Sequence, residues 1–259
     1  MKICCFASGS RGNCTLISIN GKNFLIDAGI SMRRICSCLA CNSLTPNDID
    51  ALLITHQHSD HISGLRMLTK YYPIKVICPR ATAAYLINSA SCSRELIEIM
   101  PIGSKIEFGD VIVSSFSTSH DTEDSVGYRI EGERIFSFAT DTGYVSDDVY
   151  KGLSGADAVI IEANHDVDML RYGEYPYHLK KRILSPMGHL SNDDCAYLVS
   201  KLYREGTKLF ILAHLSRENN TPSKALSTVK EALTGSDARV YIAPEAELLS
   251  IEIGGEDKC

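Results

Sequence analysis

The sequence predicts an α/β protein in which two sheets lie between outer helices, a four-layer αββα sandwich in one domain, residues 1–259. Short runs rich in Val, Ile and Phe, bounded by Gly, Asn, Asp or Pro, are typical of strands. Segments with helical spacing of apolar residues separate many of these runs. No Pro/Gly/Ser-rich linker, repeat or low-complexity stretch divides the chain, which favours a single domain.

The elements follow in order along the chain. Strands are expected at 2–6, 14–19, 23–27, 51–55, 76–78, 105–108, 111–117, 126–130, 134–139, 158–162, 208–213, 240–242 and 247–253. Helices are expected at 31–39, 63–72, 81–88, 147–153, 178–185, 191–205 and 222–233. The first half of the chain is expected to be a meander of strands, and the second half to alternate strand and helix. Potential site residues follow strand runs, where loops of α/β sheets commonly carry function.

Composition excludes several classes of protein. Hydrophobic residues make up 44% of the chain, and its apolar runs are too short to span a bilayer. The N-terminal residues lack a long apolar segment, so we expect no signal peptide and a cytoplasmic location. A net charge of −6 gives nucleic-acid binding no support from bulk charge, although bound metals and a local patch can supply a positive field.

The ten cysteines are interpreted as reduced thiols of an intracellular protein. Cys36, Cys38 and Cys41 suggest a metal site at first sight. Their offsets of two and five do not converge on one helix face, and no fourth ligand is nearby. We therefore interpret them as structural or incidental.

The densest signal is the segment Thr55-His-Gln-His-Ser-Asp-His61. Three histidines and a carboxylate within six residues are a ligand set suited to Zn, Fe or Mn. A tight turn can aim His56 and His58 at one ion and Asp60 and His61 at a second. An exposed polar turn is the alternative, but this density of ligands has no obvious structural purpose.

Two ions need further ligands, and polar residues at the ends of later strands can provide them. His120 follows the strand expected at 111–117, Asp141 follows 134–139, and His214 follows 208–213. Singly, each is more typical of a hydrogen-bonded loop. Together with the dense motif they complete a plausible dinuclear shell.

This pattern resembles the metallo-β-lactamase superfamily along essentially the whole chain. The resemblance implies one metal held by His56, His58 and His120. It implies a second held by Asp60, His61 and His214, with Asp141 bridging the two. Asp27, in Leu-Ile-Asp-Ala-Gly, matches the family's supporting Asp and would fix the orientation of a ligand.

Spacing narrows the choice within the superfamily. Only 21 residues separate His120 from Asp141 and 73 separate Asp141 from His214, which leaves no room for a large exosite arm or a capping insertion. The motifs Ala7-Ser-Gly-Ser-Arg-Gly-Asn-Cys14, Ile161-Glu-Ala-Asn-His-Asp166 and His214-Leu-Ser-Arg-Glu-Asn-Asn220 resemble those of the YycJ/WalJ family. That family is associated with 5′-to-3′ exonuclease action on DNA. Ala163 and Ala7 depart from its common Ser and Gly, and neither is a ligand.

The resemblance implies hydrolysis of a phosphodiester by a hydroxide held between two divalent ions, with Zn²⁺ favoured and Mn or Fe allowed. Asp60 and Asp141 would orient that hydroxide, and His189 would protonate the leaving oxygen. A helix-start histidine is the alternative for His189, and His178 is expected at the surface. Residues expected to support ligands or contact substrate are Ser8, Ser10, His165, Ser216, Asn219 and Asn220, although turn formation alone can explain several of them.

Three functions stay open. The first is a nuclease, with DNA favoured over RNA and no membrane partner. The second is an ester or thioester hydrolase of small molecules, and the third is a metal-binding regulatory protein without catalysis. Oligomeric state does not follow from the residues.

Overall fold

The computed structural model describes residues 1–254, which divide into two compact units. The first unit comprises Met1–Val113, Glu131–Arg134 and the described residues from Pro244 onward. The second comprises Ser114–Ile130 and Ile135–Ala243. The expectation of one domain over 1–259 stays a prediction.

The first sheet has the strand order β14-β1-β2-β3-β4-β5-β6. Its strands are β1 Lys2–Ala7, β2 Cys14–Ile19, β3 Lys22–Ile26, β4 Ala51–Leu53, β5 Val76–Cys78, β6 Ile97–Ile99 and β14 Leu249–Glu252. Pairing is antiparallel from β14 to β3 and parallel from β3 to β6. The predicted meander is right for β1–β3, and strands β7, β8 and β9 are also neighbours in sequence order in the second sheet. It is wrong for β3–β6, where helices intervene between parallel strands.

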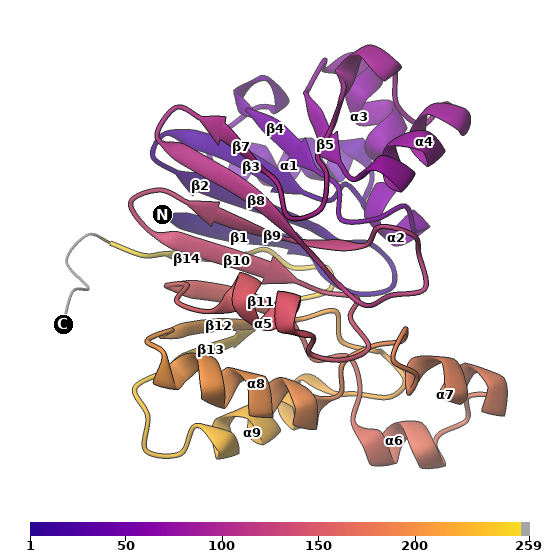
Figure 1. Cartoon of the computed structure of the whole chain (residues 1–259), viewed down its shortest axis with the longest axis vertical. Coiled ribbons are helices and arrows are strands. Elements are labelled where there is room, and N and C mark those ends of the chain that lie inside the picture. Colours follow the sequence, from indigo (N-terminus) through magenta and orange to yellow (C-terminus); the bar gives the residue numbers. More distant parts are fainter. Residues whose placement is uncertain (255–259) are drawn as a thin grey trace. The chain divides into compact units, whose positions relative to one another are not determined.

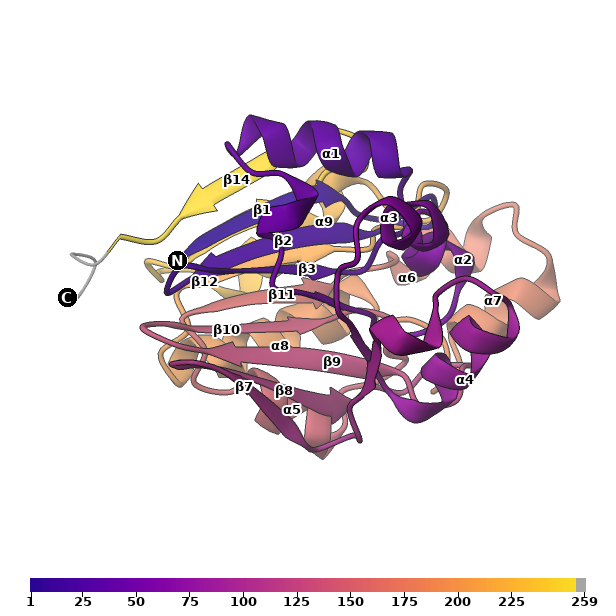
Figure 2. The same cartoon turned by 90° about the horizontal axis from the view of Figure 1, so that it is seen from above.

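Helices of the first unit cover one face of this sheet (Figure 2). They are α1 Met32–Cys41, α2 Ser59–Ile62, α3 Leu65–Tyr71 and α4 Arg80–Asn88. Ile35 and Leu39 of α1, one turn apart, are fully buried against Phe6 and Leu16 of the strands. Short 3₁₀ turns at Pro46–Asp48 and Arg94–Leu96 lead into β4 and β6.

The second sheet has the order β13-β12-β11-β10-β9-β8-β7 (Figure 1). Its strands are β7 Lys105–Phe108, β8 Val111–Ser117, β9 Val126–Glu131, β10 Ile135–Ala139, β11 Ala158–Glu162, β12 Leu209–Ala213 and β13 Arg239–Ile242. From β10 to β13 the pairing is parallel. Helices α5 Asp147–Leu153, α8 Asn192–Arg204 and α9 Pro222–Ala232 share a buried core with these strands, and α6 Val167–Tyr172 and α7 Tyr177–Ile183 complete the unit.

The parallel register brings candidate site residues to the carboxyl ends of the strands in each sheet. In the second unit Ala139 pairs with Ile161 and Glu162 pairs with Ala213, so Asp141, Glu162 and His214 emerge from the carboxyl ends of adjacent strands. In the first unit Ile26 pairs with Leu53, which places Asp27 beside the segment that starts at Ile54. The expectation that these candidate site residues follow strands is confirmed.

Most expected elements are present, with ends shifted by a few residues. The short β6 and the helices α2 and α6 have no counterpart among the predicted elements. The segment 63–72 is helical only from Leu65. Within residues 1–254 no helix is both long and apolar enough to cross a membrane.

Candidate metal centre

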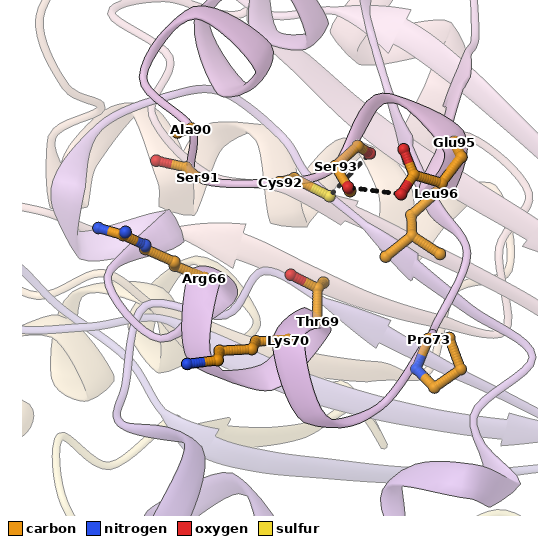
Figure 3. Close-up of a pocket in the computed structure, with 10 residues that line it drawn as sticks. All are labelled: Arg66, Thr69, Lys70, Pro73, Ala90, Ser91, Cys92, Ser93, Glu95 and Leu96. Carbon is orange, nitrogen blue, oxygen red and sulfur yellow. Dashed lines mark hydrogen bonds between the residues drawn. The ribbon is translucent and has the colours of Figure 1, made fainter.

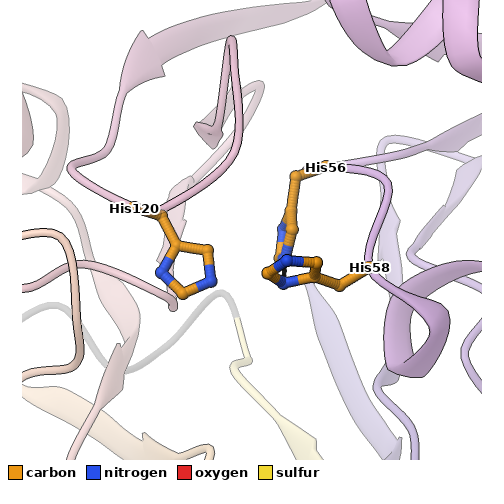
Figure 4. Close-up of side chains that lie close together, drawn as sticks. All are labelled: His56, His58 and His120. Atoms are coloured by element: carbon orange, nitrogen blue, oxygen red, sulfur yellow. Dashed lines mark hydrogen bonds between the residues drawn. The ribbon is translucent and has the colours of Figure 1, made fainter. Parts of the chain in front are cut away.

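The His-rich segment forms the connection between β4 and α2. Thr55 and His56 are buried directly after the strand, and His58 is the N-cap of α2. The rings of His56 and His58 meet edge to face with centroids 4.7 Å apart (Figure 4). The ring of His61, from α2, lies 4.1 Å from that of His56. The first unit therefore gathers three imidazoles at one turn; Figure 4 also shows His120, which belongs to the second unit.

Asp27 organises this turn from the end of β3. Its carboxylate is fully buried and accepts hydrogen bonds from the Thr55 N–H at 2.9 Å and from Nδ1 of His61 at 2.7 Å. Burial raises the pKa of Asp27, and the neighbouring His61 opposes that rise. Because a carboxylate only accepts, Nδ1 of His61 carries the proton and Nε2 keeps the lone pair that can bind a metal. Asp27 therefore fixes the orientation of His61, and its role in supporting a metal ligand stays a prediction.

A glycine-rich loop packs against the turn from the other side. The Asn13 N–H donates to the Asp60 carbonyl at 2.7 Å, and Asn13 Nδ2 lies 3.1 Å from His61 Nε2. A Cβ on Gly29 would stand 1.6 Å from the Asp60 carbonyl oxygen, so only glycine allows this close approach. Ser8 and Ser10 flank Gly9, whose N–H donates to the Asn13 side chain. The contact of these serines with substrate stays a prediction.

In the second unit His120 lies on the loop after β8. Its Nδ1 is 3.2 Å from the Gly188 carbonyl oxygen, an acceptor, so Nε2 is again the atom with a lone pair. Nε2 lies 3.7 Å from Oδ1 of Asp141. The rings of His120 and His189 have centroids 5.1 Å apart, and those of His189 and His214 are 5.2 Å apart.

Glu162, at the carboxyl end of β11, is the organising carboxylate of the second unit. Oε1 accepts from Nδ1 of His189 at 2.8 Å and from Nδ1 of His214 at 2.9 Å. Oε2 accepts from the N–H groups of Thr142 and Leu190 at 3.0 and 3.1 Å. Glu162 lies within the motif Ile161–Asp166 and was not predicted to have a role of its own. The sequence does carry a signal for Glu162, because a carboxylate ends the otherwise apolar run Ala158–Ile161, and a buried carboxylate needs partners.

The electrostatics of Glu162 follow from these contacts. Burial alone would raise the pKa of Glu162, but the imidazoles of His189 and His214 hold it well below its usual range. Burial alone would lower the pKa of His189. The charge and hydrogen bond of Glu162 exceed this effect, so the pKa of His189 is raised. The carboxylate is therefore ionised, and His189 has its Nδ1 proton fixed on Glu162.

Three site residues adopt left-handed backbone conformations. The φ angles are 61° at Asp27 and 56° at both Asp141 and His214. Asp27 and His214 come directly after β3 and β12, and one residue separates Asp141 from the end of β10. The chain therefore turns sharply where each strand ends. Asp and Asn tolerate this conformation better than most side chains, at a cost of order 1–2 kcal/mol for an ordinary residue.

His165 and Asn219 lie in the second unit with side chains that the fold leaves unsatisfied. Among the described residues, no hydrogen-bond partner reaches either ring nitrogen of His165 or the carboxamide atoms of Asn219. Burial lowers the pKa of His165 to about 4, so the ring is neutral near pH 7. The substrate or ligand role expected of both residues stays a prediction. His178 is exposed, as expected.

Ser216 and Asn220 belong to the loop between β12 and α9. The Ser216 hydroxyl accepts from the Asn219 N–H at 3.2 Å. The side chain of Asn220 donates to the Ala163 carbonyl at 2.9 Å and exchanges hydrogen bonds of 2.8 and 2.9 Å with Asn192. Asn220 therefore links α8 to the segment after β11, and contact of Ser216 and Asn220 with substrate stays a prediction.

Replacing Asn220 with Ala is expected to destabilise the protein by about 1–3 kcal/mol, because buried partners lose their hydrogen bonds. Chemical denaturation measures this loss, and metal content should stay close to that of the wild type. Ser227→Ala, an exposed change on α9, is the control. Unchanged stability with lost activity would instead make Asn220 a substrate contact.

Cysteine does not contribute to these clusters within residues 1–254. The nine described cysteines are free thiols, and none joins a group of side chains placed to hold a metal. Burial raises the pKa of Cys5 and Cys78 to about 12, so both are protonated packing residues.

Comparison with known proteins decides the family. Residues 22–215 match the Beta-lactamase superfamily domain. The chain is 40% identical to the exodeoxyribonuclease WalJ of Streptococcus pneumoniae (serotype 2, strain D39), over 91% of this chain and 89% of that protein. It is 38% identical to the exodeoxyribonuclease YycJ of Bacillus anthracis, over 88% and 87% respectively. The chain belongs to the WalJ/YycJ family of the β-lactamase superfamily.

The fold of this WalJ/YycJ family member is confirmed by a solved structure. Zn²⁺-bound PqqB from Methylobacterium extorquens superposes with a TM-score of 0.71 at 16% identity, covering 98% of this chain and all of that one. The fold is the expected α/β sandwich of the metallo-β-lactamase type, with two mixed sheets flanked by helices. The family relationship makes the chain a metal-dependent hydrolase, and its histidine and carboxylate clusters are placed so that they could hold metal ions.

Proposed function

We propose that the protein is a dinuclear metal-dependent phosphodiesterase and, more specifically, a 5′-to-3′ exonuclease that acts on DNA in the cytoplasm. The family relationship to WalJ and YycJ carries this proposal, since both are named exodeoxyribonucleases and match nearly the whole chain. The chemistry of the two clusters supports it, because imidazole and carboxylate donors suit borderline divalent ions.

The donor set fits a pair of divalent ions. Hydrogen bonds to Asp27, Gly188 and Glu162 fix Nδ1 of His61, His120 and His214 respectively, which presents Nε2 for coordination. In our proposal one ion takes His56, His58 and His120, the second takes Asp60, His61 and His214, and Asp141 is shared. Zn²⁺ is the ion we favour; Mn²⁺ or Fe²⁺ would also suit the carboxylates. Bound there, the ions would activate water and neutralise the charge that develops on phosphorus.

The chain's own residues would do the rest of the chemistry. Asp60 and Asp141 supply carboxylate oxygens that can orient the attacking water and accept its proton. His189, held at Nδ1 by Glu162 and 18% exposed, can present Nε2 to the leaving oxygen of a substrate. Asp141 lies 3.7 Å from Nδ1 of His189, so the ring stands at the edge of the ligand cluster. This geometry supports His189 as the general acid.

One assay tests the proposal. Metal-loaded protein is incubated with 5′-labelled single- and double-stranded DNA, matched RNA, bis-p-nitrophenyl phosphate and a thioester. Release of mononucleotides from the 5′ end of DNA is the expected result, and it is lost in His58→Ala. Turnover of the thioester alone would make the protein a small-molecule hydrolase. A metal-replete protein inert on every substrate would favour a regulatory role.

A further inference from the structure

A hollow in the first unit lies outside the residues assigned so far. It has a volume of about 510 Å³ and is bounded by α3 on one side and by the segment between α4 and β6 on the other (Figure 3). Its lining residues are Arg66, Thr69, Lys70, Pro73, Ala90, Ser91, Cys92, Ser93, Glu95 and Leu96. Its lining combines apolar surface with the charged side chains of Arg66, Lys70 and Glu95.

Charge is unevenly distributed within the hollow. Arg66 and Lys70 stand one helical turn apart on α3 and extend on the same side as Ser91, whereas Glu95 and Pro73 lie on the other side (Figure 3). Both cations are exposed, and neither forms an ion pair within the part of the chain that is described. The Glu95 carboxylate accepts the Ser93 hydroxyl at 2.6 Å. The Ser91 hydroxyl lies 2.8 Å from that of Ser89, and the Lys70 ammonium lies 5.7 Å from the centre of the Tyr71 ring. The hollow therefore offers two exposed cations at one end, and cationic donors suit phosphate.

The hollow is joined directly to the His-rich turn. Helix α3 starts three residues after α2 ends, and both linking residues, Ser63 and Gly64, keep right-handed helical backbone angles. Arg66 and Lys70 therefore follow His61 by five and nine residues along the chain.

We propose that the Arg66–Lys70 hollow binds backbone phosphates of the nucleic-acid substrate away from the bond that is cleaved. This inference rests on the proposed function for the identity of the ligand. It also supplies the local positive patch that a chain of net charge −6 needs to hold a polyanion. The site would favour long strands over dinucleotides, because a dinucleotide does not reach it.

The test compares wild type with Arg66→Ala/Lys70→Ala, all metal-loaded. Binding to a non-hydrolysable phosphorothioate 12-mer is followed by fluorescence anisotropy over a range of salt concentrations. We expect roughly tenfold weaker binding and a salt slope smaller by about 1.4–1.8, the loss of two phosphate contacts. KM for a hydrolysable 12-mer should rise, while kinetics on a dinucleotide and on bis-p-nitrophenyl phosphate stay unchanged. Lys151→Ala/Lys230→Ala, two exposed lysines on α5 and α9, removes the same charge elsewhere.

The outcomes separate the possibilities. Equal binding and equal salt slopes in the two double variants would overturn the hollow as a backbone site. Inorganic phosphate that binds the wild type and not Arg66→Ala/Lys70→Ala, with 12-mer binding unchanged, would also overturn it and make the hollow a site for free phosphate. A wild type that binds the 12-mer through this hollow but cleaves no nucleic acid would sink the proposed function and leave the binding site standing.

Discussion

Asp27→Asn is expected to lower the affinity of the first unit's cluster for divalent metal by about 10–100-fold and to reduce hydrolysis accordingly. The amide oxygen can still accept from the Thr55 N–H, so its NH₂ group must face His61. His61 then has to accept at Nδ1 and carry its proton on Nε2, the atom needed for coordination. Asn also tolerates the left-handed backbone at this position, so the fold is preserved.

Metal titration monitored by calorimetry, with activity measured at saturating metal, checks this result. Asp110→Asn, an exposed change of the same charge, should behave like wild type. Circular dichroism verifies that both variants are folded. If Asp27→Asn bound metal as tightly as wild type, the idea that Asp27 sets the tautomer of His61 would have to be abandoned.

Glu162→Gln is expected to reduce kcat by 100-fold or more while leaving a folded protein. The carboxylate satisfies two backbone N–H groups on one side and two imidazole N–H groups on the other. Backbone amides cannot change, so the glutamine NH₂ must face the imidazoles. His189 and His214 would then both lose the tautomer that suits them for proton donation and for coordination.

The variant separates these two losses. Metal content after dialysis reports on His214, and kcat at saturating metal reports on His189. We also expect destabilisation of about 1–3 kcal/mol, because a buried group loses well-matched partners. Glu107→Gln on the exposed face of β7 is the control. Full activity in Glu162→Gln would show that neither imidazole depends on this carboxylate.

The fold could be predicted from sequence where local pattern and tertiary role agree. Apolar runs such as Ala158–Ile161 are buried on both sides and end at a polar residue, so their limits were clear. The three-residue β6 carries a glutamate in Ile-Glu-Ile and forms by pairing with β5, which a local pattern does not reveal. Parallel pairing from β3 to β6 is likewise a tertiary choice, since strand propensity does not encode direction.

The candidate site divides in the same way. Ligand types at strand ends are visible in sequence because His and Asp interrupt apolar runs. The hydrogen bonds that orient them join residues far apart in the chain, such as Glu162 with His214 and Asn13 with Asp60. These contacts depend on sheet order, which is why Glu162 and Asn13 received no individual role. The Arg66–Lys70 hollow needs both α3 and the loop before β6, so a scan for charge runs could not find it.

The left-handed turns at Asp27, Asp141 and His214 limit which substitutions family members can accept at these positions. A side chain at these positions has to suit the left-handed backbone as well as the proposed chemistry. A change of Asp to Asn keeps the left-handed backbone and removes the charge, so catalysis can be lost without a second substitution that restores the fold. A change to Val, Ile or Thr fails on both counts. Family members that have abandoned hydrolysis should therefore be recognisable by amides at 27 and 141 in an otherwise conventional fold.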